Sequence, residues 1–122
     1  MLRQMMKSKI HRATLTALRP DYEGSIAIDE DLLDAADILP GEQVHVLNLN
    51  NASRIVTYAI RAPRGSGAVE LNGPAARCGL PGDIVVIVAY ASYPDDEARA
   101  LSPRIVLVTP KNRPRSLSRR RK

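Results

Sequence analysis

Short stretches of alternating apolar and polar residues run along the chain, and turn-forming residues such as Pro, Gly, Asn and Asp separate them. A period of two residues is typical of a β-strand that buries one face. Such stretches lie within 1–16 and at 25–28, 43–49, 54–61, 69–71 and 104–109. The stretch 84–91 is apolar throughout, which indicates a strand that is buried on both faces.

The N-terminal segment has no helical periodicity and ends in the alternating sequence HRATLT. We therefore expect a strand there. Simple alternation places Lys9 and His11 on one face of this strand and Ile10 and Arg12 on the other.

Helical signals are fewer and shorter than strand signals. Asp29, followed directly by two acidic residues, is a good N-cap because negative charge in the first turn suits the helix dipole. The helix that it starts has an apolar face and ends at Pro40-Gly41. Single helical turns are expected at 75–78 and at 94–100.

The pattern as a whole predicts a single domain, since 122 residues suit one hydrophobic core. Many short strands with turn signals every 8–12 residues or so are typical of all-β folds. We therefore expect a mainly β barrel or sandwich with two or three short helices.

Charge changes this picture at the C-terminus. The net charge is +5, yet seven of the 18 Lys and Arg residues lie in 110–122, which has no acid. Residues 1–109 then hold 11 basic and 13 acidic groups, a net charge of −2. We expect 1–109 to be the folded domain and 110–122 to be a disordered basic tail. Contact between this tail and nucleic acid or an acidic partner is the less favoured alternative.

The single cysteine, Cys78, excludes an intrachain disulfide and a cysteine-based metal cluster. This suits a reducing compartment. No secretory signal pattern is present near the N-terminus, and the apolar stretch 84–91 is too short to span a membrane as a helix. We expect a soluble cytoplasmic protein that makes no contact with a membrane.

Few residues suit ordinary catalysis. His11 and His45 have no metal-ligand spacing, and no nucleophile elbow, dinucleotide fingerprint or P-loop is present. His45 lies on an alternating strand, so we interpret it as a half-buried structural residue rather than a base. The loop 63–67 is rich in Gly but lacks the strand-to-helix context of a phosphate-binding loop.

A set of polar residues remains, and its members together suit a small anionic substrate, because charged hydrogen bonds to carboxylates are strong. Singly, each has an ordinary role in a strand or at the surface. Arg54 and Tyr58 share one face of a strand, whereas Thr57 points to the other face. The set comprises Lys9, His11, Tyr22, Ser25, Arg54, Thr57, Tyr58, Asn72 and Gly73.

Seven segments of the chain, occurring in this order, carry a resemblance to a known family. They are KSKIHRATLT (7–16), YEGSIAID (22–29), RIVTYAI (54–60), RGSG (64–67), LNGPAARC (71–78), GDIVVIVAY (82–90) and PDDEAR (94–99). In combination they make residues 1–109 resemble the pyruvoyl-dependent L-aspartate α-decarboxylases.

The resemblance implies a double-psi β-barrel that assembles as a homotetramer, with active sites between subunits. It implies conversion of L-aspartate to β-alanine and CO2, which serves pantothenate and coenzyme A biosynthesis. It also implies that the proenzyme cuts itself between Gly24 and Ser25, into pieces 1–24 and 25–122. Ser25 would become a covalent pyruvoyl cofactor whose ketone forms a Schiff base with aspartate, and no metal would be needed.

Residue roles also follow from the resemblance. Thr57 would stabilise the Gly24 carbonyl oxygen during self-cleavage and contact substrate afterwards, and Tyr58 would donate a proton to the carbanion. The remaining residues would bind substrate or support the site. Lys9 and Arg54 would hold carboxylates, Gly73, Pro74 and Ala75 would line the pocket, and His11, Tyr22 and Asn72 would make supporting contacts.

Two features sit uneasily with these roles. Pro74 has no backbone N–H, so it offers no such donor to a substrate. Thr57 and Tyr58 point to opposite faces of a flat strand. A bulge, the geometry of a strand end, or a site at a subunit edge would each let both reach one pocket.

Two alternatives to the enzyme stay open at this point. One is a non-enzymatic β-barrel binding module that uses its basic C-terminal tail. The other is an inactive relative that never matures, although Gly24, Ser25, Thr57 and Tyr58 are all present.

Overall fold

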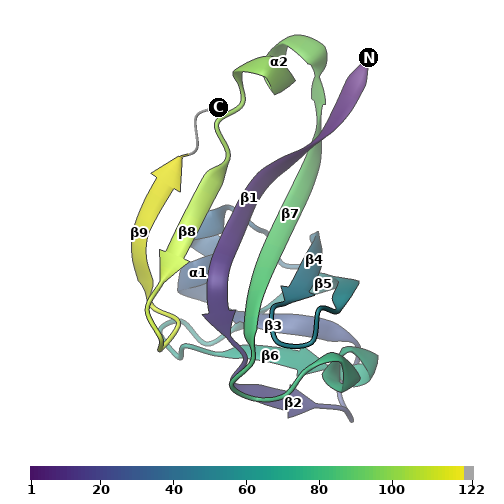
Figure 1. Ribbon diagram of the computed structural model, residues 1–122, viewed down its shortest axis with the longest axis vertical. Helices are drawn as coiled ribbons and strands as arrows, with labels where there is room; N and C mark the ends of the chain where they lie inside the picture. The colour runs from purple at the N-terminus through teal and green to yellow at the C-terminus, as the bar shows by residue number, and fades with distance from the viewer. Residues whose placement is uncertain (120–122) are drawn as a thin grey trace.

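The computed structural model describes the backbone of residues 1–119 and the side chains of residues 1–115. Nine strands and three short helices follow one another along residues 1–119 (Figure 1). They are β1 (Leu2–Thr14), β2 (Ala17–Arg19), β3 (Ser25–Asp29), α1 (Glu30–Ala36), β4 (Gln43–Asn48), β5 (Arg54–Ala62), β6 (Val69–Asn72), the 3-10 helix η1 (Gly73–Cys78), β7 (Ile84–Pro94), α2 (Asp95–Ala100), β8 (Arg104–Val108) and β9 (Pro114–Arg119).

The strands form one sheet in the order β2-β6-β3-β5-β4-β7-β1-β8-β9. β1 and β7 are the longest strands and run side by side up the molecule, while β2, β3 and β6 cross beneath them (Figure 1). Three pairs are parallel, namely β1 with β8, β2 with β6, and β3 with β5. The other pairs are antiparallel.

The sheet curls because consecutive strands lie far apart in its order. β1 is near one end and β2 is at the other, yet only Leu15 and Thr16 separate them. The Thr16 N–H donates to the Val69 carbonyl at 2.8 Å, which ties the end of β1 to the start of β6. The aliphatic side chains enclosed by this curl form the core, with Ile10, Ile26 and Ile87 fully buried. The predicted mainly β fold with short helices is confirmed, and the double-psi β-barrel that the resemblance implied agrees with it.

Asp29 starts α1 as predicted and also holds a neighbouring loop. Its side chain accepts a hydrogen bond from the Asp31 N–H at 2.8 Å, which is an N-cap. It also accepts from Gly65 N–H at 3.0 Å and Gly67 N–H at 2.8 Å. Burial alone would raise the pKa of this carboxyl, but these three donors and the nearby Arg113 hold it below its ordinary value.

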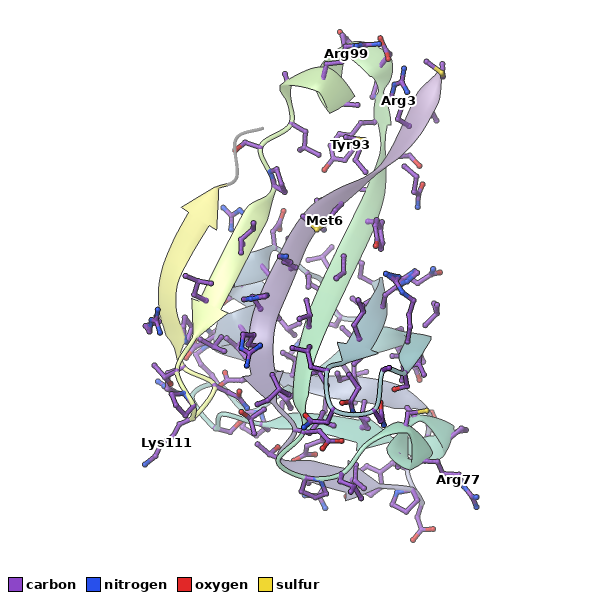
Figure 2. All side chains as sticks on the ribbon, viewed as in Figure 1. Arg3, Met6, Arg77, Tyr93, Arg99 and Lys111 are labelled. Atoms are coloured by element: carbon purple, nitrogen blue, oxygen red, sulfur yellow. The ribbon has the colours of Figure 1, made fainter. Side chains whose placement is uncertain are left out.

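The short helix α2 caps the far end of β1 and β7. Arg3 and Arg99 lie together at this end (Figure 2), and both donate to the Asp95 carboxylate, at 2.6 and 3.0 Å. No helix among residues 1–119 is both long enough and apolar enough to cross a membrane.

The expected alternation along β1 is wrong at Arg12. Ile10 is fully buried, whereas Arg12 is exposed and has a φ of +66°. The pairing register with β7 shifts between Ile10 and Ala13. This bulge inserts extra backbone and turns Arg12 away from the face that it would share with Ile10.

The prediction of a disordered tail from residue 110 is wrong for residues 110–119. Pro114–Arg119 forms β9, which pairs antiparallel with β8. Asn112 is 1% exposed, donates to the carbonyls of Thr14 and Gly67 at 2.8 Å each, and accepts from Thr14 N–H. Backbone pairing with β8 and one buried amide hold this segment in place. The remaining residues of the expected tail, 120–122, lie outside the described part of the chain.

Candidate active site

Ser25 is the first residue of β3 and lies between two other strands. It pairs with Asn72 of β6, and the parallel register that joins Ile26 to Ala59 brings Ser25 level with Tyr58 of β5. Ser25 is 2% exposed. Its position is therefore set by the sheet rather than by a surface turn.

A hydrogen bond defines the direction of the Ser25 hydroxyl. Asn72 Nδ2 donates to Ser25 Oγ at 3.0 Å. An amide nitrogen has no lone pair to accept with, so the hydroxyl oxygen is the acceptor and its own proton points elsewhere. Asn72 Oδ1 is buried and has no hydrogen-bond partner among the described residues. Ser25 thus keeps a lone pair engaged and its proton free for transfer.

Gly73 allows the segment before Ser25 to approach closely. It has a φ of +60°, and a Cβ added to it would lie 2.7 Å from Gly24 N and 2.8 Å from the Tyr22 carbonyl oxygen. Gly24 itself has no positive φ, and a Cβ on it would meet only Pro74 Cδ, at 3.4 Å. The left-handed backbone conformation that favours glycine is therefore found at Gly73 and not at Gly24.

A hollow of about 440 Å³ opens beside this segment. Both Thr57 and Tyr58 line it, together with Gly24, Ile55, Val56, Pro74, Ala75 and Cys78. The geometry of a strand end explains how two neighbours on β5 share it. β3 pairs with β5 only from Ala59 onward, so the edge of β5 before Ala59 is open. No bulge interrupts the pairing of β4 with β5.

One family model, described as aspartate decarboxylase, matches residues 1–115. The chain belongs to the aspartate decarboxylase family. The match reaches past residue 109 and includes Asn112, which is ordered in the fold. Membership of this family agrees with the resemblance seen in the sequence.

In this aspartate decarboxylase, most of the predicted site residues meet around the hollow. Gly24, Thr57, Tyr58, Pro74 and Ala75 line it directly. Ser25, Asn72 and Gly73 lie immediately behind them, through the contacts given above. Tyr22 contributes its carbonyl to this packing, but its side chain is exposed and lies under the Arg19 guanidinium, 5.7 Å from the ring centroid.

Lys9 and His11 are not part of the hollow. Both are on β1, and β7 and β4 separate β1 from β5 in the sheet. Three strand spacings are roughly 14 Å along the sheet, which exceeds the reach of a lysine side chain. One chain of the decarboxylase thus lacks Lys9 and His11 at its own candidate site.

His11 is affected by its neighbours on the bulged strand. Burial lowers the pKa of the imidazole below its ordinary value, and the positive charges of Lys9 and Arg12 lower it further. His11, Arg12 and Arg115 line a separate hollow of about 380 Å³. Within the described residues, no cluster of His, Cys, Asp and Glu is arranged to hold a metal ion.

Sequence reasoning missed some of the residues that line the hollow, and it missed the partner of Arg54. Cys78, Ile55 and Val56 line the hollow, and His45 contacts Arg54. The signal for His45 was the hairpin between β4 and β5. Its short loop fixes a register in which Leu47 pairs with Arg54 and His45 with Val56.

Proposed function

We propose that this member of the family is an aspartate 1-decarboxylase that matures by cutting itself between Gly24 and Ser25. It would then convert L-aspartate to β-alanine and CO2 for pantothenate and coenzyme A biosynthesis. The observation that carries the proposal is the buried Ser25, bonded by Asn72 at the edge of a hollow that Gly24, Thr57 and Tyr58 line.

Self-cleavage begins when Ser25 Oγ attacks the Gly24 carbonyl carbon. The C–N amide bond breaks and a C–O ester forms, while the proton of the hydroxyl moves to the released amine. Thr57 lines the same hollow as Gly24 and is the donor for the oxyanion. A single oxyanion donor is worth about 10²–10³-fold in rate elsewhere. Elimination of the Gly24 carboxylate and hydrolysis with loss of ammonia then leave a ketone at position 25.

The residues around Ser25 suit this group, because a small hollow opens beside the backbone at Gly24 and the chain supplies polar and phenolic side chains to it. The pyruvoyl group supplies an electron sink for decarboxylation once it is formed. The chain's own residues bind and orient the substrate. Arg54 holds a carboxylate, Tyr58 donates the proton that replaces CO2, and Ala75 with Pro74 closes the wall.

Lys9 is proposed to complete the site from another subunit. Two strands, β4 and β7, separate it from β5 within its own chain, and Arg54 has no carboxylate partner among the described residues. A second carboxylate of aspartate needs a second cation. The resemblance implied a homotetramer with sites between subunits, and such an assembly would let a neighbouring copy supply Lys9 and His11.

Intact mass spectrometry tests the maturation step. The purified protein should give two pieces, of residues 1–24 and 25–122, with the larger piece lacking a free amino group at its start. Ser25→Ala should stay as one chain of 122 residues and produce no β-alanine from L-aspartate. A wild-type chain that remains whole after prolonged incubation would refute the proposal.

The same variant separates an enzyme from a binding module. A module that acts through its basic C-terminal segment would keep its binding after Ser25→Ala. Pro114–Arg119 is engaged as β9, so its backbone is already paired on one side.

A further inference from the structure

Arg54 is held by a neighbour that sequence analysis took for a structural residue. Arg54 Nη1 lies 3.0 Å from His45 Nδ1. A guanidinium has only donors, so His45 Nδ1 must be the acceptor. The ring is then neutral in this contact and carries its proton on Nε2.

The sheet fixes both partners. His45 pairs with Val56 and Arg54 pairs with Leu47, so the two residues are diagonal neighbours on the same face of β4 and β5. Tyr90 of β7 packs edge-on against the His45 ring, with the centroids 4.9 Å apart and the planes at 67°. The imidazole is thus held from two sides and offers a fixed acceptor to the guanidinium.

The chemistry of this acceptor differs from that of the carboxylates that pair with several other arginines. Arg64 contacts the carboxylates of Glu30, Asp31 and Asp34, which offset its charge. Among the described residues, Arg54 has no carboxylate within ion-pair distance, and its partner is a neutral ring. A neutral acceptor orients the guanidinium and leaves its full positive charge for an anionic ligand.

Arg54 does not line the hollow itself, but it lies on the strand that forms one wall of it. It shares a face of β5 with Val56 and Tyr58, which line the hollow beside Gly24. Along β5, Arg54 is two residues from Val56, which lines the hollow, and four residues from Tyr58, the proposed proton donor.

We propose that His45 is a positioning residue that directs Arg54 toward a carboxylate of the substrate. This inference rests on the proposed function, because it assigns to Arg54 the binding of aspartate. His45 touches Arg54 and not the reacting atoms, so it is expected to act on substrate binding rather than on proton transfer.

Steady-state kinetics of the cleaved enzyme on L-aspartate test this role. His45→Phe keeps an aromatic ring against Tyr90 but removes the acceptor, and should raise KM about 5–10-fold with kcat within about twofold. His45→Asn places an amide oxygen near the position of Nδ1 and should return KM to within about twofold of wild type. Adding His45→Phe to an Arg54→Gln chain should change KM no further.

The controls separate this inference from the function beneath it. Intact mass should show the same extent of cleavage in wild type and all His45 variants. An unchanged KM in His45→Phe, or a loss in kcat alone, would overturn the inference and leave the decarboxylase intact. A fully cleaved wild type that makes no β-alanine would overturn both.

A measurement on the wild-type protein covers the case in which the variants fold poorly. Nitrogen-15 NMR of the imidazole should show His45 Nδ1 unprotonated and Nε2 protonated near neutral pH. A protonated Nδ1 in the neutral ring would contradict the contact with Arg54.

Discussion

Single contacts at this site are directional because one partner of each can only donate. Asn72 Nδ2 can only donate to Ser25 Oγ, and Arg54 can only donate to His45 Nδ1. The first contact leaves the Ser25 proton free to leave, and the second leaves the Arg54 charge unpaired. The neutral amide of Asn72 thus orients Ser25 without binding its proton, and the neutral ring of His45 orients Arg54 without offsetting its charge.

Replacing Gly73 with alanine should cause both backbone strain and a close contact with the segment before Ser25. Gly73→Ala forces an alanine into a φ of +60° and places its Cβ 2.7 Å from Gly24 N. We expect self-cleavage, followed as the fraction of the 25–122 piece over time by mass spectrometry, to slow at least tenfold. The segment that would carry the proposed cut must shift to make room for the methyl group.

Gly41→Ala is the matched control for this substitution. Gly41 also has a positive φ, of +91°, but a Cβ there meets nothing within 4 Å. Gly41→Ala should lose about 1–2 kcal/mol of stability in thermal unfolding through its backbone conformation alone, and Gly73→Ala should lose more, because its Cβ also meets the backbone of Gly24. Equal cleavage rates in the two variants would show that contact with Gly24 is irrelevant to maturation.

At the scale of elements, the sequence predicted what depends on neighbours along the chain. α1 begins after Asp29 as expected, because the cap and the acidic first turn are local signals. The hairpin of β4 and β5 was likewise predicted to within a residue at most ends. β2 was not expected, since three residues carry too little pattern to be seen.

Features that depend on distant partners could not be predicted in the same way. The bulge at Arg12 begins where the pairing of β1 with β8 ends, and it shifts the register of β1 against β7. Thr57 and Tyr58 share a hollow because β3 stops short along β5. The whole fold decides which strands pair when they are far apart in sequence. The alternation of apolar and polar residues within one strand does not reveal its partners.

The ordered C-terminal segment gives a prediction at this scale. Deleting 114–122 removes β9 but keeps Asn112, whereas deleting 110–122 also removes the three hydrogen bonds of Asn112 with Thr14 and Gly67. Their loss leaves buried backbone groups unpaired, at about 1–3 kcal/mol each. The longer deletion should therefore lower the urea midpoint clearly further than the shorter one.

Asn112→Ala in the full chain removes the side-chain hydrogen bonds of Asn112 and leaves β9 in place. It should reproduce most of the difference between the two deletions. If both deletions unfold at the same urea concentration, Asn112 does not stabilise the junction of β1 and β6.

On the scale of the whole molecule, the separation of Lys9 from β5 predicts a site shared between copies. Lys9→Ala and Ser25→Ala chains should each be nearly inactive alone. Co-expressed in equal amounts, they should recover about a quarter of wild-type activity, because some sites then combine an intact Ser25 with an intact Lys9 from a neighbour.

Sites contained within one chain would recover nothing in this experiment, since neither chain holds both residues. Tagging the two chains differently and purifying through both tags confirms that mixed assemblies formed. Activity in the doubly purified fraction decides between the two arrangements.

The pairing of β1 on both of its edges has a consequence for a protein that matures as proposed. β1 lies between β7 and β8 and leads directly into β2, which pairs with β6. The proposed cut after Gly24 would remove a covalent link and none of these pairings, so the short piece would stay paired within the sheet. Once denatured, a protein cut in this way would be two separate peptides, and its refolding would become a second-order encounter that dilution slows. The proposed maturation would thus turn folding from a reaction of one chain into a reaction between two.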